Sequence, residues 1–194
     1  MKAFIIGNGV SRSEFDLEEL RGKGTIFGCN ALYRDFTPDY LVAIDDKIIA
    51  EINHAIDTGE CEVPQSNFIV PSWNECFEAT TGRRSNAGMN AMLEAIKLGH
   101  DEIYCLGFDF LIDDEISVKN VYDGTPCYGA ETRAVREDNS NRAAYLEYVA
   151  LNNRNVSFAF VYPPMDNFKL LTVSCDNVFG MFYNTLEEKV LNGN

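Results

Sequence analysis

The sequence has none of the features that mark membrane-spanning, secreted or zinc-binding proteins. It contains no run of about eighteen apolar residues, and it starts with a strand pattern instead of a basic region followed by a signal-peptide core. Its six cysteines are scattered, and no two of them are spaced as Cys-x-x-Cys. This spacing favours reduced thiols over a disulfide framework or a zinc site. We therefore expect a cytoplasmic protein with no membrane span, no metal and no cofactor.

Positive charge is also scarce. The chain has 16 Lys and Arg against 30 Asp and Glu, which gives a formal net charge of −14. Nucleic-acid backbones and anionic membrane surfaces would repel such a protein, so no nucleic-acid partner is expected. A small anionic ligand remains compatible with this charge, because a few local cations and a helix N-terminus can hold a phosphate against the average field. The positions of the basic residues therefore matter for function.

Apolar segments of strand length alternate with segments of helical periodicity. Strands are predicted at 4–6, 25–30, 40–44, 67–71, 102–110 and 156–162, and helices at 13–20, 47–57, 86–98, about 131–151 and 178–191. A chain of 194 residues, 46% of them hydrophobic, can bury one sizeable core, and no stretch reads as a linker, a repeat or a low-complexity segment. We predict an α/β fold with one domain over 1–194, in which a mostly parallel sheet has helices on both faces.

The first strand leads into a glycine loop. Gly7 and Gly9 allow a tight turn and a close approach of the backbone to a ligand, which would lie outside the carboxyl end of the strand. The dinucleotide-binding fingerprint is incomplete, because Arg12 stands at the third glycine position and Asn30 ends the next strand in place of Asp or Glu. A nicotinamide or flavin enzyme is therefore disfavoured. The glycines could also serve only to turn the strand into a helix.

The second informative stretch lies just before the helix at 86–98. Arg83 and Arg84 precede this helix, which Ser85 or Asn86 would cap. Their charges would add to the dipole and the free N–H groups of the first turn, and this combination is typical of a phosphate site. The alternative is that both arginines are solvated loop cations, although they form the only Arg-Arg pair in an acidic chain. The next two residues are small, as a close approach of a ligand would require: Ala87 and Gly88.

Other stretches are open to more than one interpretation. Asp45 and Asp46 stand where a strand ends and a helix begins, so they either cap the helix or contact a ligand or metal. Residues 111 to about 130 are predicted to form a flexible, lid-like loop, because so long a connection in a compact domain is often functional. The last predicted helix carries aromatic residues that we expect in the core rather than at a subunit contact: Phe179, Phe182 and Tyr183. The oligomeric state stays open.

Three motifs together resemble a known family. They are Gly-Asn-Gly-Val-Ser at 7–11, Phe-Gly-Cys-Asn at 27–30, and the stretch from Ala87-Gly88 to Leu-Gly-His-Asp-Glu-Ile-Tyr-Cys-Leu-Gly-Phe-Asp-Phe at 98–110. In this order and spacing they resemble bacterial sialyltransferases that modify lipo-oligosaccharide, and related Rossmann-like proteins with a Gly-Asn-Gly-Pro-Ser start. The resemblance covers most of the chain. It implies a single Rossmann-like domain of the sialyltransferase-like, GT-A-related kind that binds a cytidine monophosphate sugar.

The resemblance also assigns site residues. Asn8, Ser11 and Asn30 would contact the nucleotide, residues 85–88 would cradle its phosphate or ribose, and Asp109 would belong to the same pocket. Asparagine offers donors and an acceptor, which suits a neutral base or sugar hydroxyls better than a carboxylate would. The nucleotide-binding set is therefore Gly7, Asn8, Gly9, Ser11, Asn30, Arg83, Arg84, Ser85, Asn86, Ala87, Gly88 and Asp109.

The chain departs from the family in its catalytic groups. The family's Thr-Ser-Gly turn is Asn-Ala-Gly here, and the lid is short. The family's histidine base has no counterpart, because the only histidines are His54 and His100, and His100 is expected to cap carbonyls at a helix end. Glu137 and Asp138 are the nearest titratable groups to the expected place of the base. Either could act as the base if burial raised its pKa, or both could be solvated helix charges.

These observations lead to one main hypothesis and two alternatives. The main hypothesis is a metal-independent glycosyltransferase that transfers a sugar from a nucleotide-activated donor, such as a CMP-sugar, by direct attack of an acceptor hydroxyl. The first alternative is a protein that binds or sequesters a nucleotide without transfer. The second is hydrolysis of a nucleotide or nucleotide sugar. The missing histidine favours the two alternatives, whereas the glycine loop is compatible with all three.

Overall fold

The computed structural model describes residues 1–72, 77–78, 83–132, 134–164, 169–171 and 173–193, and at 77, 78, 83, 84 and 132 it describes the backbone only. Within these residues, seven parallel strands form one sheet in the order β4-β3-β2-β1-β7-β8-β9. The strands are β1 (Lys2–Ile6), β2 (Thr25–Cys29), β3 (Tyr40–Val42), β4 (Phe68–Ile69), β7 (Glu102–Leu106), β8 (Ser157–Tyr162) and β9 (Val178–Phe182). A separate antiparallel pair joins β5 (Phe77–Glu78) to β6 (Arg83–Arg84).

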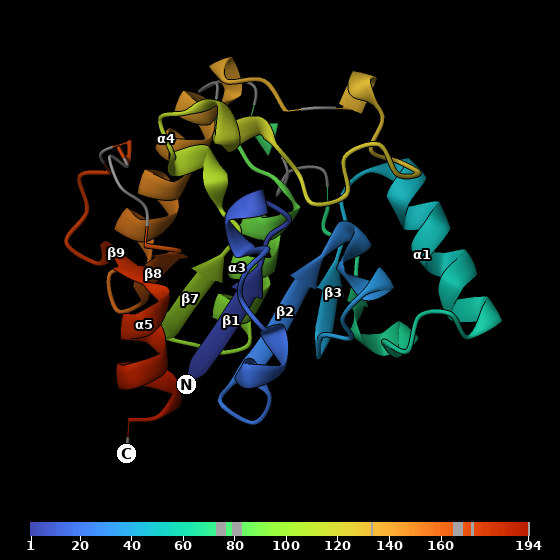
Figure 1. Ribbon diagram of the computed structural model, residues 1–194, viewed down its shortest axis with the longest axis horizontal. Coiled ribbons are helices and arrows are strands. Elements are labelled where there is room, and N and C mark those ends of the chain that lie inside the picture. The colour runs from blue at the N-terminus through green and yellow to red at the C-terminus, as the bar shows by residue number, and fades with distance from the viewer. Residues whose placement is uncertain (73–76, 79–82, 133, 165–168, 172, 194) are drawn as a thin grey trace.

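Helices cover both faces of the sheet (Figure 1). The α-helices are α1 (Asp46–Thr58), α3 (Ala87–Lys97), α4 (Glu137–Asn152) and α5 (Tyr183–Leu186), and a π-helical turn (Glu187–Leu191) follows α5. Short 3-10 helices lie at Val10–Arg12, Leu17–Leu20, Asn30–Arg34, Gln65–Asn67, Asp109–Leu111, Glu115–Val118 and Ala130–Thr132. Among the described residues, no helix combines the length and apolarity needed to cross a bilayer.

The core forms two layers because strand side chains alternate between the faces of the sheet. Phe4 and Ile6 of β1 pack with α1 and α5 on one face. Ala3 and Ile5 pack with α3 and α4 on the other face. The strands are buried on both sides, which explains why they read as continuous apolar runs. The predicted α/β class, with a parallel sheet between helices, is confirmed.

The helix predicted at 86–98 is also confirmed, as α3. Asn86 is its N-cap, because the Asn86 Oδ1 accepts a hydrogen bond of 2.9 Å from the Met89 N–H. Gly99 follows the helix with a φ of 86°, in the left-handed region that glycine favours. His100 contacts the Ala95 carbonyl oxygen through Nδ1 at 3.0 Å, so the capping role predicted for it is confirmed.

Two predicted helices are wrong in whole or in part. The segment 13–20 contains only the short 3-10 helix Leu17–Leu20, where Asp16 accepts from the Glu18 N–H. At 178–191, the first five residues form strand β9, because they pair in parallel with the exposed edge of β8. Two of the three aromatic side chains predicted in the core are consequently on the surface. Phe179 and Phe182 are exposed, whereas Tyr183 is buried.

Candidate functional site

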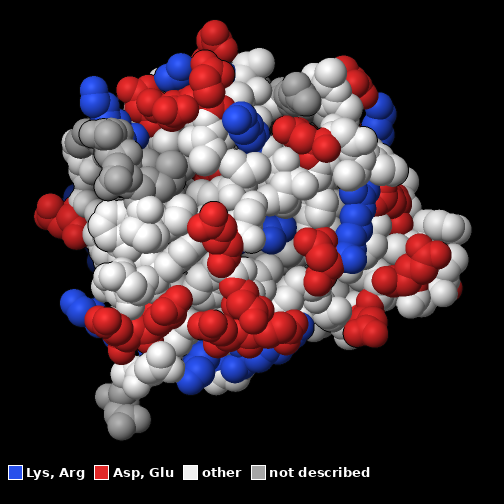
Figure 2. Space-filling view, in the orientation of Figure 1, with Lys and Arg blue, Asp and Glu red and all other residues white. Residues whose placement is uncertain are grey.

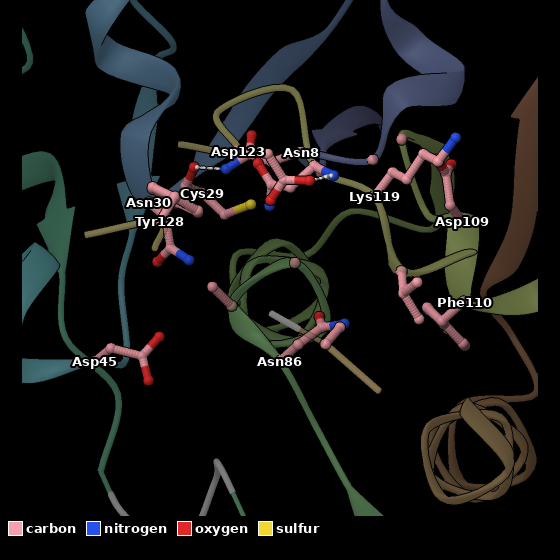
Figure 3. Close-up of a pocket in the computed structure, with 18 of the residues that line it drawn as sticks. Asn8, Cys29, Asn30, Asp45, Asn86, Asp109, Phe110, Lys119, Asp123 and Tyr128 are labelled. Atoms are coloured by element: carbon pink, nitrogen blue, oxygen red, sulfur yellow. Dashed lines mark hydrogen bonds between the residues drawn. The ribbon is translucent and has the colours of Figure 1, made fainter. Parts of the chain in front are cut away.

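A cavity of about 600 Å³ opens at the carboxyl ends of β1, β2, β3 and β7, where open parallel sheets place their ligands. Its floor is formed by the loops that follow these strands and by the first residues of α3. Residues of the segment 117–131, Ala134 and Arg142 of α4 complete its walls. In Figure 3, α3 is seen close to end-on beneath the cavity, with Asn86 at its start and with Asn8, Asn30 and Tyr128 above and beside it. The sequence-based placement of a ligand outside β1 therefore coincides with a real hollow.

Two glycine-containing strand ends cross at the floor of the cavity. The Gly7 N–H donates to the Leu106 carbonyl at 2.8 Å, and the Gly9 N–H donates to the Gly107 carbonyl at 3.0 Å. A Cβ on Gly7 would lie 2.5 Å from the Gly107 oxygen, a distance that real Cβ atoms do not show. Gly7 and Gly9 do line the cavity, but the close approach that requires glycine at position 7 is to the neighbouring backbone.

Asp109 is directed at the glycine loop and is 3% exposed. Its carboxylate accepts hydrogen bonds from the Ser11 N–H, at 3.0 Å, and from the Ser11 hydroxyl. Tyr183 of α5 donates its hydroxyl to the Ser11 carbonyl, so three distant segments meet at one residue. Burial raises the pKa of Asp109, while the bonds from Ser11 and the charge of Arg12 oppose that rise. Asp109 lines the cavity, whereas Ser11 lies behind the lining and is engaged by Asp109.

Asn8 and Asn30 each place a side-chain oxygen in the cavity wall. The Asn8 Nδ2 donates to the Cys29 carbonyl at 3.1 Å, which fixes the amide so that Oδ1 points the other way. Asn30 has a φ of 52°, a left-handed conformation that asparagine tolerates better than most residues. Both Oδ1 atoms are buried and have no hydrogen-bond partner among the described residues. Buried acceptors without partners are rare in folded proteins, so these two are candidates for a hydrogen bond from a ligand or from water.

The start of α3 forms another part of the wall. Asn86, Ala87 and Gly88 line the cavity, as predicted for a helix N-terminus that faces a ligand. A Cβ on Gly88 would lie 2.8 Å from the Phe108 ring, so this small residue is also required for packing. Ser85 is outside the lining and accepts a hydrogen bond from Asn90 at 2.9 Å. The backbone of Arg83 and Arg84 forms β6 beside α4, and their side chains lie outside the described residues, so their phosphate role stays a prediction.

One buried cation in the cavity was missed by the sequence interpretation. Arg142 of α4 lines the cavity and is 9% exposed. Its NH1 donates to the Asn139 Oδ1 at 3.1 Å, and its NH2 lies 3.8 Å from the Asp138 carboxylate. The helical period offered a signal, because the buried residues Asn139, Arg142, Leu146 and Val149 are spaced by three or four positions.

The two predicted base candidates lie at different places at the start of α4. Glu137 is exposed and lines a separate, shallower hollow beside Asp113 and Arg136. Asp138 is partly buried and lies outside the cavity lining. Its carboxylate lies beside Arg142, which lines the cavity. The chain's two histidines lie elsewhere: His54 is exposed on α1, and His100 is buried at the opposite end of α3.

The segment 111–130 forms one wall of the cavity and is tied to the strand ends. The Val121 N–H donates to the Asn8 carbonyl at 2.9 Å. Arg34 follows β2 and pairs with Glu51 of α1 at 2.5 Å. The same guanidinium donates to two atoms of the wall, the Thr125 Oγ1 at 2.8 Å and the Pro126 carbonyl at 2.9 Å. The segment predicted as lid-like is thus anchored to the loops that carry Asn8 and Asn30.

The two aspartates at the start of α1 also line the cavity. Asp45 is the N-cap residue of α1, yet its side chain makes no capping hydrogen bond. It projects toward the lower part of the cavity in Figure 3. Asp46 lies in the first turn, where its charge favours the helix dipole. Among the described residues, no cluster of three or more His, Cys, Asp or Glu has the geometry of a metal site.

No model of a known protein family matches this chain, and no curated protein matches it in sequence. Solved structures of a sialyltransferase do match its fold. The structure of the sialyltransferase CstII from Campylobacter jejuni with the substrate analogue cytidine-5′-monophosphate has a TM-score of 0.56 and 15% identity, over 82% of this chain and 79% of that chain. A CstII structure with CMP gives a TM-score of 0.57 at 14% identity and covers 100% of both chains. A third, with a trisaccharide acceptor and CMP, gives 0.52 at 14% identity over 99% of this chain and 100% of that one. This chain therefore has a Rossmann-like α/β fold similar to that of the CstII sialyltransferase.

Proposed function

We propose that this protein binds a nucleotide-activated sugar in the cavity at the carboxyl edge of its sheet and transfers the sugar to an acceptor hydroxyl. The observation that carries the proposal is the pair of buried amide oxygens on Asn8 and Asn30, two residues that line the cavity in a fold whose solved neighbours hold CMP.

The lining suits the parts of a nucleotide. The Asn8 and Asn30 oxygens accept hydrogen bonds, and the exocyclic amino group of a base or the hydroxyls of a ribose would supply the donors. A phosphate would lie near the N-terminus of α3 and the cationic side chains of the wall. The donor is a nucleotide sugar, and a CMP-sugar is the first one to test, because CMP is the ligand of the neighbouring structures.

The reaction itself needs a proton acceptor. An acceptor hydroxyl attacks the anomeric carbon, the bond from that carbon to the phosphate oxygen breaks, and the hydroxyl proton moves to a base. Asp138 is the better placed of the two predicted bases, because it is partly buried beside a residue of the cavity. The phosphate charge is assigned to side chains, so the reaction is expected to survive a chelator.

The direct test is a panel of nucleotide sugars, with free nucleotide measured with and without sugar acceptors and with and without EDTA. Nucleotide release that depends on an acceptor supports transfer. Release without an acceptor indicates hydrolysis. Binding without release indicates a non-catalytic nucleotide-binding protein, an alternative favoured by the location of both histidines away from the cavity.

A first prediction concerns the two asparagines. Asn8→Ala or Asn30→Ala should weaken nucleotide binding by about 1–3 kcal/mol, because each change removes a buried acceptor and leaves the ligand donor unpaired. Calorimetry with CMP measures the effect. Asn53→Ala is the matched control, since Asn53 lies on α1 outside the cavity lining and bonds only the Ile49 carbonyl among the described contacts. Unchanged affinity in both cavity variants would show that the nucleotide binds elsewhere.

A further inference from the structure

We propose that Arg142 binds the negatively charged group of the cavity's ligand and so sets a preference for nucleotides over nucleosides. The inference rests on the proposed nucleotide binding. It assigns the anion to a residue of α4, which lies outside the two segments predicted to bind the nucleotide, the glycine loop and the start of α3.

Arg142 is held in place before any ligand arrives. It lies one turn after Asp138 on a 16-residue helix that packs against the sheet. Asn139 links it to the neighbouring Ser117, because the Asn139 Oδ1 accepts from Arg142 at 3.1 Å and the Asn139 Nδ2 donates to the Ser117 Oγ at 3.0 Å. Asn139 and Ser117 are both buried. A side chain fixed in this way loses little rotamer freedom on binding, which favours affinity.

The described cations that line the cavity differ in burial, and Arg142 is 9% exposed. Two other cations line the cavity, Lys47 and Lys119, and both are exposed. An exposed lysine attracts an anion through water and is screened by salt, whereas a buried guanidinium interacts in a lower local dielectric. Arg142 is therefore the stronger anion partner of the three.

The chemistry selects a planar or tetrahedral oxyanion. A guanidinium can offer two parallel N–H donors to one phosphate or carboxylate group, which a lysine ammonium cannot do. A nucleotide sugar carries a phosphate ester, and an acidic sugar adds a carboxylate. Phosphate and carboxylate are both oxyanions with two acceptor oxygens. CMP is the probe that carries the phosphate without the transferred sugar.

The test is a thermodynamic cycle that removes the negative charge from the ligand or the positive charge from the protein. The affinities of CMP and cytidine are measured by calorimetry for the parent protein and for Arg142→Met, Arg142→Lys and Arg136→Met. The control residue Arg136 is six positions before Arg142, exposed and paired with Asp113 at 2.8 Å, and it lies outside the cavity lining. We expect the preference of the parent for CMP over cytidine to fall at least about tenfold in Arg142→Met, to fall less in Arg142→Lys, and to stay unchanged in Arg136→Met.

Each outcome decides the assignment. Equal loss of CMP and cytidine binding in Arg142→Met and Arg142→Lys would mean that Arg142 only supports the fold, and the inference would be overturned. It would also be overturned if the preference survived in both variants and disappeared in Arg83→Met or Arg84→Met, since the anion would then bind the arginine pair. If the parent protein bound neither CMP nor cytidine, the proposed function would fail first, and the assignment of Arg142 would fail with it.

Discussion

A buried carboxylate at a ligand cavity can bind a ligand or stabilise the surrounding loops. The described hydrogen bonds of Asp109 stabilise the glycine loop. Its oxygens accept from the N–H and hydroxyl of Ser11, and a Cβ on Gly9 would lie 2.4 Å from its carboxyl carbon. The resemblance to sialyltransferases placed Asp109 and Ser11 in one nucleotide pocket. Their contacts with each other fix the loop that carries Asn8, and a direct contact of either residue with a nucleotide stays a prediction.

This role predicts a pH dependence of stability. Burial raises the pKa of Asp109 in the folded state above its unfolded value of about 3.9, so the folded state binds the proton more tightly. The contribution of Asp109 to the free energy of unfolding is therefore largest below about pH 4 and falls as the pH rises through the folded-state pKa. Asp109→Asn should remove this dependence. Denaturant unfolding of both proteins between pH 3.5 and 7 measures it, and a parent-minus-variant difference that grows with pH would contradict the assignment.

The base is the second question at the scale of single residues. Asp138→Asn should keep nucleotide binding and lower turnover by roughly a hundredfold or more, because the amide keeps the shape but cannot accept the proton. Glu137→Gln is the matched control, as it neutralises the neighbouring carboxylate, which is exposed and lies outside the cavity lining. Steady-state rates with the donor found in the panel measure the effect. Equal turnover in Asp138→Asn and the parent would remove Asp138 as the base.

At the scale of elements, the ends of β1 and β7 depend on each other. Gly107 has a φ of 71°, and a Cβ there would lie 2.6 Å from the Gly7 carbonyl oxygen. Gly124 has a similar φ of 83° in the 111–130 wall, but a Cβ there meets no atom within 4 Å. A comparison of Gly107 with Gly124 therefore separates the effect of steric crowding by neighbouring atoms from the effect of a left-handed backbone.

Alanine substitution at these two glycines should give different results. Both changes incur a left-handed backbone cost of about 1–2 kcal/mol. Gly107→Ala adds a backbone clash of about 1–3 kcal/mol and displaces the Gly7–Gly9 loop, so CMP affinity should fall as well. Thermal unfolding and calorimetry measure the two effects. If Gly107→Ala and Gly124→Ala behaved alike, the crossing of the two strand ends would not be tightly packed.

The elements that the sequence predicted well are those set by local patterns. The strands near 4–6, 102–106 and 157–162 read as apolar runs because both faces of the sheet are covered, and α3 has its own cap in Asn86. Strand β9 was mistaken for a helix because its conformation depends on pairing with β8, which no local pattern records. The conformation of the 111–130 wall is likewise set by long-range bonds, such as that from Val121 to Asn8.

The candidate site divides in the same way. Asn8, Asn30 and Asn86 were found because they follow strands or start a helix, and such positions converge at one edge of a parallel sheet. The contact of Ser11 with Asp109 could not be predicted, because the two residues are 98 positions apart in sequence. Arg142 was overlooked because the turn of α4 that carries it is mostly polar. Its burial can be predicted only when the spacing of the buried residues is followed along the whole helix.

At the scale of the whole molecule, the charge of the protein opposes the charge of its proposed ligand. The formal net charge is −14, and acidic side chains are spread over the face seen in Figure 2. Among the described residues that line the cavity, five are acidic and three are basic: Asp45, Asp46, Asp109, Asp123 and Glu131 against Lys47, Lys119 and Arg142. The long-range field is therefore repulsive for a phosphate, even though Arg142 attracts it at short range.

The difference between long-range repulsion and short-range attraction predicts how salt affects the rate of CMP binding. The screening length is about 30 Å at 0.01 M salt and about 8 Å at 0.15 M, so added salt weakens the distant repulsion more than the buried contact with Arg142. The association rate constant of CMP should rise over this range, whereas that of uncharged cytidine should stay constant. Stopped-flow protein fluorescence, to which Tyr128 of the cavity lining contributes, or binding to surface-immobilised protein measures both rates. A CMP rate that falls with salt would mean that local cations, and not the net charge, dominate the field at the cavity entrance.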